Sequence, residues 1–97
     1  MTRQQVTQIL AAHERELRGM GVKSLALFGS LARDEATDSS DVDLLVEFDR
    51  PIGYFHFFDV QEYLQKLIPA PKVDLVMRDA VYEELKEDIY AEALDVL

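Results

Sequence analysis

Three stretches of this chain carry apolar residues three or four positions apart, and that spacing predicts a helix in each. They cover residues 2–20, residues 54–68, and the segment from Asp79 or Ala80 to about Leu94. Thr2 and Gln5 form a capping box that begins the first helix. Gly21 is suited to end that helix in a left-handed conformation.

Shorter apolar runs predict three strands, over Lys23–Phe28, Asp41–Phe48 and Val73–Met77. Side chains alternate between the faces of a strand. The second strand should therefore turn one set to the core (Val42, Leu44, Val46, Phe48) and the other set away from it (Asp41, Asp43, Leu45, Glu47). One or two helical turns from Leu31 to about Glu35, and a loop over 37–40, connect the first two strands. The order of elements predicts a single α/β (α+β) domain over residues 1–97, with helices packed on a small mixed sheet of about three strands.

The composition excludes several classes of protein. The chain has 97 residues and no cysteine, so disulfides and thiolate zinc sites are excluded. It has no apolar run of about 18 residues that could cross a membrane, and its first residues do not resemble a signal peptide. We therefore expect a cytoplasmic protein without a membrane association.

The formal net charge of −9 bears on the choice of partner. Nucleic-acid duplexes are bound largely through Lys and Arg, and the ten basic residues here are scattered. A small nucleotide, held by a metal ion and backbone amides, fits this charge better than a duplex of DNA or RNA. A basic protein partner fits it too.

Three aspartates interrupt strands that are otherwise apolar. Asp41 and Asp43 point to the same face, with Cα atoms about 6.5 to 7 Å apart, where two carboxylates repel by about 2 to 3 kcal/mol at an effective dielectric constant near 20. Asp74 follows in Lys-Val-Asp-Leu-Val on the next strand. The alternative to a metal is that each aspartate pairs with Arg or Lys or lies at an exposed strand end, but Lys72 is the only basic residue in the flanking strand sequence. Oxygen ligands without Cys or a His cluster indicate Mg²⁺ or Mn²⁺.

Gly29 and Ser30 stand where the first strand ends and the next helical turn begins. A glycine there lets the backbone approach an anion closely, and the amides and the hydroxyl that follow can donate hydrogen bonds to it. Phosphate at this turn and a metal ion at the aspartates is the arrangement needed for metal-assisted phosphoryl or nucleotidyl transfer.

These motifs together resemble the polymerase-β-type nucleotidyltransferase superfamily. Gly-Ser-Leu-Ala-Arg, Ser-Asp-Val-Asp-Leu-Leu-Val-Glu-Phe and Val-Asp-Leu-Val resemble in particular its small prokaryotic branch, the minimal nucleotidyltransferases (MNT). The resemblance implies a two-metal mechanism in which Asp41 and Asp43 each hold both Mg²⁺ ions. Asp74 would complete the catalytic ion and help to activate the acceptor hydroxyl.

The same resemblance implies a nucleotide site. Gly29 and Ser30 would hold the triphosphate of ATP or another nucleoside triphosphate, and pyrophosphate would be released. Arg33 matches the family's Ala-Arg pair and would bind phosphate or support the local structure. The family often has glycine after that arginine, where this chain has Asp34.

The resemblance also implies a partner. Proteins of this branch are typically antitoxins of HEPN-domain ribonuclease toxins, and some silence the toxin by adenylylating a tyrosine, so a hetero-oligomer is expected. The alternative is an antitoxin that neutralises the toxin by stoichiometric binding, with docking on the acidic residues of the last helix (Glu83, Glu84, Glu87, Asp88, Glu92, Asp95). A simple solvated helix face is the plainer interpretation of those residues. Transfer to a small molecule such as an aminoglycoside ranks last, because no further domain is present to enclose such a substrate.

Overall fold

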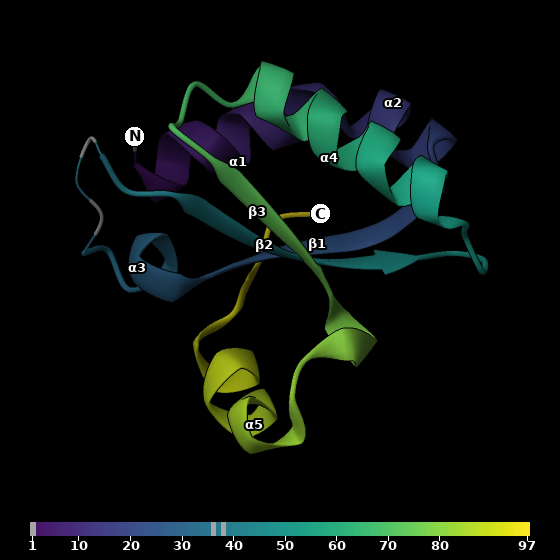
Figure 1. Cartoon of the computed structure of the whole chain (residues 1–97). Coiled ribbons are helices and arrows are strands. Elements are labelled where there is room, and N and C mark those ends of the chain that lie inside the picture. Colours follow the sequence, from purple (N-terminus) through teal and green to yellow (C-terminus); the bar gives the residue numbers. More distant parts are fainter. Residues whose placement is uncertain (1, 36, 38) are drawn as a thin grey trace.

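The computed structural model describes residues 2–35, 37 and 39–97, which form helices on both faces of one sheet. Its elements are α1 (Arg3–Ala12), α2 (Glu14–Gly19), β1 (Val22–Phe28), α3 (Gly29–Ala32), β2 (Val42–Phe48), α4 (Tyr54–Leu67), β3 (Val73–Met77), the 3₁₀ turn η1 (Arg78–Ala80), α5 (Glu83–Glu92) and β4 (Leu94–Asp95). α1, α2 and α4 cover one face and α5 lies on the other (Figure 1). The predicted α+β class is confirmed. In the described part of the chain, no helix has both the length and the apolar character that a membrane span requires.

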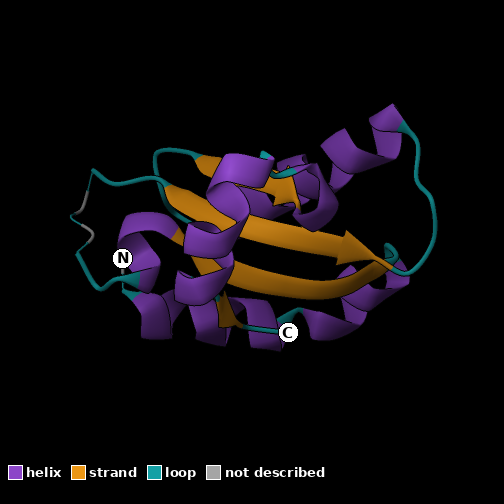
Figure 2. Cartoon of the chain, turned by 90° about the horizontal axis from the view of Figure 1, so that it is seen from below, coloured by secondary structure: helices purple, strands orange, loops and turns teal. Residues whose placement is uncertain are grey.

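The sheet is mixed, with strand order β3-β2-β1-β4. β1 is antiparallel to β2 and to β4, whereas β2 and β3 are parallel. Parallel neighbours need a crossover connection, and α4 supplies it, which explains why the helix lies between two paired strands in the sequence. Figure 2 views the sheet from the side on which α5 crosses the strands.

The prediction of three strands missed β4. The helix expected to reach Leu94 ends at Glu92, and Ala93 is already extended, with φ −66° and ψ 136°. Leu94 and Asp95 then pair with Leu27 and Ala26. The open edge of β1 offers these last residues backbone partners that a further helical turn would not, so tertiary pairing overrides helix propensity.

Each face of the sheet has its own apolar cluster. The larger one lies under α1, α2 and α4 and includes the predicted core residues Val42, Leu44 and Val46. On the other face Leu45 is buried with Ala26 and Val81, beneath α5. Asp43 lies on the same face as Leu45, because the two are two positions apart in β2. The aspartates on β2 and β3 therefore lie on the side of α5.

Two helix predictions need correction. The first helix is broken at His13, whose Nδ1 lies 2.8 Å from the Ile9 carbonyl oxygen and whose N–H bonds the Leu10 carbonyl in a tighter turn. Gly21 ends the second half with φ +88°, as predicted. In α5 the expected apolar stripe is only partly buried, since Leu85 is 48% exposed.

Candidate active site

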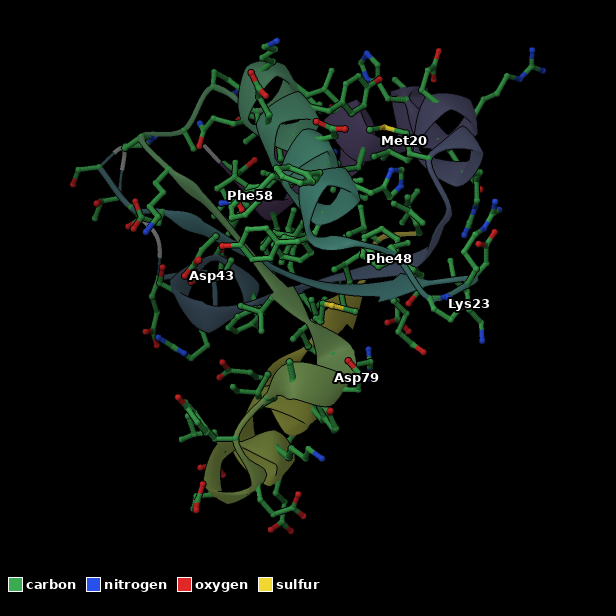
Figure 3. All side chains as sticks on the ribbon, turned by 45° about the vertical axis from the view of Figure 1, so that its right-hand side comes forward. Met20, Lys23, Asp43, Phe48, Phe58 and Asp79 are labelled. Atoms are coloured by element: carbon green, nitrogen blue, oxygen red, sulfur yellow. The ribbon has the colours of Figure 1, made fainter. Side chains whose placement is uncertain are left out.

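The predicted metal ligands come from the starts of two parallel strands. Asp43 and Asp74 are register partners in the pairing of β2 with β3, so their Cα atoms are separated by about 4.8 Å, the usual spacing of neighbouring strands. Asp41 directly precedes β2 and is exposed. Figure 3 shows Asp43 next to α3, at the end of the sheet away from Lys23 and Asp79.

The surroundings of Asp43 disfavour its negative charge. Partial burial raises the pKa of the Asp43 carboxyl group, and the charges of Asp74 and Asp41 raise it further. Arg33 and Lys72 act in the opposite direction but do not cancel the shift. The charges of Asp74 and Asp41 are thus close enough to Asp43 to oppose its ionisation, which is an electrostatic condition that a divalent cation relieves.

The side chains are not gathered into a finished ligand cluster. Among residues 2–35, 37 and 39–97, no three His, Cys, Asp or Glu side chains lie close enough together to hold a metal ion. Carboxylates without a cation between them repel, and this repulsion adds to the larger effect of partial burial in raising the pKa of Asp43. The backbone places the three residues together, while the metal site itself stays a prediction.

Gly29 packs directly against Asp43. Its φ is +74°, a conformation that L side chains rarely adopt, and a Cβ there would lie 2.3 Å from the Asp43 Oδ2. The antiparallel pairing of β1 with β2 causes this contact, because Phe28 is the register partner of Asp43. α3 begins at Gly29 itself, two residues earlier than predicted. Only glycine fits here, and the Gly-Ser turn (Gly29 and Ser30) therefore lies against a predicted metal ligand.

Arg33 is held by two carboxylates. Its Nε donates to Glu35 Oε2 at 3.2 Å, and its NH1 donates to both oxygens of Glu92, at 3.3 and 3.1 Å. The hydrogen bonds that Arg33 donates to Glu35, and then those to Glu92, raise the pKa of the arginine. The Glu92 side chain is 28% exposed. The prediction that Glu92 belongs to a solvated acidic face is therefore wrong.

Asp34 takes the left-handed conformation, with φ +61°. It follows Arg33, the residue that caps the C-terminal end of α3, and this position after a helix commonly adopts such a conformation and favours glycine. Aspartate tolerates it better than most residues. Asp34 therefore adopts a conformation that glycine would favour, despite the departure from the family's glycine.

Comparisons with known proteins agree with this geometry. The chain matches the model of the nucleotidyltransferase domain family over residues 8–96. The protein adenylyltransferase MntA of Thermococcus cleftensis is 36% identical over 97 residues, which are 99% of this chain and 97% of that protein. A candidate protein adenylyltransferase of Methanocaldococcus jannaschii is 44% identical over 78 residues, 79% of each chain. A solved structure of a candidate minimal nucleotidyltransferase superposes with a TM-score of 0.81 at 28% identity, covering 97% of this chain and 95% of the other.

The chain belongs to the minimal nucleotidyltransferase family. This nucleotidyltransferase is an enzyme, and the family resemblance carried by its Gly-Ser and Asp-x-Asp motifs is confirmed. The fold brings Gly29, Asp43 and Asp74 to one end of the sheet. Glu92 is the site neighbour that sequence reasoning missed. Nothing local distinguishes it from the other acidic residues of α5, since its partners lie 59 and 63 positions away.

Two hollows on the surface of the nucleotidyltransferase lie apart from these residues. One, of about 650 Å³, lies between the end of β2, η1 and Tyr90. The other, of about 460 Å³, lies between the start of α4 and β3 and is mainly apolar. Neither is lined by Gly29, Ser30 or the three aspartates.

Proposed function

We propose that this enzyme transfers AMP from ATP to a hydroxyl group, that of a tyrosine, on a HEPN ribonuclease toxin in the cytoplasm, and so acts as the antitoxin. The observation that carries the reaction is the contact of the Gly29 backbone with the Asp43 carboxylate. It joins a phosphate-binding turn to a carboxylate of raised pKa. The similarity to a protein adenylyltransferase over 99% of the chain supports the choice of AMP and of a protein acceptor.

The aspartates fit a site for Mg²⁺, or for Mn²⁺, of which two ions are expected. Asp43 and Asp74 offer oxygen ligands from adjacent strands, Asp41 adds a third, and hard divalent ions prefer such oxygens. When bound, the ions neutralise charge on the phosphates and the entering oxygen. Gly29 and Ser30 hold the triphosphate against these carboxylates. Asp74 helps to activate the acceptor hydroxyl, whose oxygen bonds to the α-phosphorus as the bond to pyrophosphate breaks.

The surface supports a protein acceptor and a hetero-oligomer. Tyr54 and Phe55, at the start of α4, are 73% and 85% exposed, and Phe58 beside them is 45% exposed. Exposed aromatic groups of this size commonly mark protein interfaces. With a net charge of −9, the chain attracts a basic partner.

Labelling of the toxin tests this function. The purified product of the neighbouring gene, tested as the HEPN toxin, is incubated with the enzyme, Mg²⁺ and ATP labelled at the α-phosphate. We expect label on a tyrosine of the toxin with the wild-type protein, and none with Asp74→Asn. Glu16→Gln, an exposed carboxylate on α2, is the matched control and should label normally. A folded wild-type protein that leaves the toxin unlabelled would exclude the reaction.

Stoichiometric docking is the second candidate, and the exposed aromatics of α4 favour it. The two candidates separate in cells that express the toxin. If docking alone protects, the double variant Asp41→Asn, Asp43→Asn protects at normal protein levels while Phe55→Ser fails. If transfer protects, the double aspartate variant fails even though it still binds the toxin.

A further inference from the structure

One carboxylate, that of Glu92, binds both ends of α3. Its Oε1 accepts a hydrogen bond from the Gly29 N–H at 3.1 Å, at the first residue of the helix. Both of its oxygens accept from NH1 of Arg33, the residue that caps the other end. α3 has only four residues and no side-chain cap of its own at its start. A helix this short is not stable on its own, so it needs contacts from residues outside the helix.

The fold delivers Glu92 to this place through β4. Leu27 pairs with Leu94 in the antiparallel ladder. Continuing that register by two residues brings position 92 opposite position 29. α5 is itself anchored, since the Tyr90 hydroxyl donates to the Arg78 carbonyl at 2.5 Å and Ile89 and Ala93 pack on the smaller core. The strand that sequence reasoning missed therefore sets the position of Glu92.

The hydrogen bond from the Gly29 N–H to Glu92 must be precise, because there is no free space on the other side of Gly29. Asp43 fills the space where a Cβ would stand, so the turn is held between the carboxylate of Asp43 and that of Glu92. A movement of the turn changes the distance between the triphosphate and the aspartates directly. Displacements of about 1 Å in such sites cost about a hundredfold in rate.

Charge alone would argue against a glutamate here. The site already contains three carboxylates and is meant to receive a triphosphate, so a fourth negative group opposes binding through space. Arg33 offsets this charge by pairing with Glu92 at 3.1 Å. Arg33 and Glu92 together form a neutral ion pair with fixed hydrogen-bond directions. Glu35 binds the same guanidinium from its other side.

We infer that Glu92 is a positioning residue, which holds the Gly-Ser turn in register with Asp43 through the Gly29 N–H and through Arg33. In this arrangement Arg33 supports the turn and is not itself a phosphate ligand. The inference rests on the proposed nucleotide site, but not on the identity of the acceptor. It gives α5 and β4 a role in the reaction that their acidic sequence does not suggest.

The test compares MgATP binding by calorimetry, without acceptor, in Glu92→Ala, Glu92→Gln, Arg33→Ala and the double variant Glu92→Ala, Arg33→Ala. We expect Glu92→Ala to weaken binding by about tenfold, part of the cost of a misplaced turn. Glu92→Gln should lose less, because its amide oxygen still accepts from the Gly29 N–H. The double variant should bind MgATP no more weakly than Glu92→Ala does, because the two residues form one ion pair. Hydrogen exchange at the Gly29 amide should become faster in Glu92→Ala.

Two controls distinguish a positioning role of Glu92 from an effect on the stability of the whole protein and from an effect of its negative charge. Val60→Ala removes buried groups from the larger core on the other face of the sheet, without touching the turn, so it should lower the melting temperature and leave MgATP binding unchanged. If it weakens binding as Glu92→Ala does, Glu92 has only a general structural role and the inference fails. If Glu92→Gln and Glu92→Ala bind MgATP more tightly than wild type, Glu92 is a competing anion and the inference fails as well. If the wild-type protein binds MgATP but labels no toxin, the proposed acceptor is wrong, and the test of Glu92 by MgATP binding still applies.

Discussion

Replacing Asp43 with asparagine should stabilise the metal-free enzyme at neutral pH. Removing a partly buried residue usually destabilises a protein. Here the wild-type side chain has a raised pKa because of burial and the charges of Asp74 and Asp41, and asparagine keeps its size while removing the charge. The folded state should therefore gain from the substitution.

The gain can be worked out from the strand geometry. Asp43 and Asp74 are register partners, so their backbones lie about 4.8 Å apart. Two unit charges at that distance repel by about 0.9 kcal/mol in water and by about 3.5 kcal/mol at an effective dielectric constant of 20. The pair is only partly buried, so screening brings the value toward the lower limit. We expect about 1 kcal/mol, which raises the melting temperature of a domain this size by about 4–8 °C.

Thermal unfolding in a chelator and in Mg²⁺ measures this effect. In the chelator, Asp43→Asn should have a higher melting temperature than wild type. In Mg²⁺ this difference in melting temperature should shrink or reverse, because an ion that binds only the native wild-type site stabilises wild type alone. Asp59→Asn, an exposed carboxylate on α4, controls for the change in net charge. A variant that melts at or below wild type in the chelator would refute the reasoning on charge crowding.

The pH dependence of the same comparison has a definite sign. A pKa that is raised in the folded state means that the folded protein binds the proton more tightly than the unfolded chain does. The destabilisation by the Asp43 charge is absent when the pH is below the aspartate pKa of the unfolded chain, about 3.9. It is complete when the pH is above the raised pKa of Asp43 in the folded protein. The stability difference between Asp43→Asn and wild type should therefore grow as the pH rises from about 4 and become constant once the pH is above the raised pKa of Asp43.

Three further substitutions test the turn, its loop and the exposed aromatics. Gly29→Ala should destabilise the protein by about 2 kcal/mol, from the left-handed conformation and the clash with Asp43, and should abolish transfer, while Gly53→Ala, with open space around it, should change the denaturation midpoint little. Asp34→Ala should cost about 1 kcal/mol in a denaturant titration, because alanine tolerates positive φ less well than aspartate, and Asp34→Gly should not. Phe55→Ser should leave the unfolding free energy within about 0.5 kcal/mol, since the side chain is 85% exposed, and should slow labelling of the toxin; normal labelling would exclude this surface as the dock.

The sequence predicted those parts of the candidate site's geometry that have local causes. Alternation along β2 placed Asp43 on the face opposite Val42, and the need for a close backbone approach identified Gly29. β4 is only two residues long, too short to carry a periodic signal, so nothing local showed that the chain re-enters the sheet. Without β4 there was no reason to choose Glu92 among the acidic residues of α5. The break at His13 likewise depends on a side chain that bonds the backbone of the preceding turn.

The second small core has a consequence for local unfolding. None of the ten residues of α5 is fully buried, and the cluster beneath this helix has only three buried members. Segments with so few buried contacts open at a lower free energy than the whole protein does. Detachment of α5 and β4 would release the carboxylate that binds the Gly29 amide, even while the larger core remains folded. The enzyme should then lose its proposed nucleotide site on warming well before its main unfolding transition, and thermal inactivation would precede the melting of the sheet.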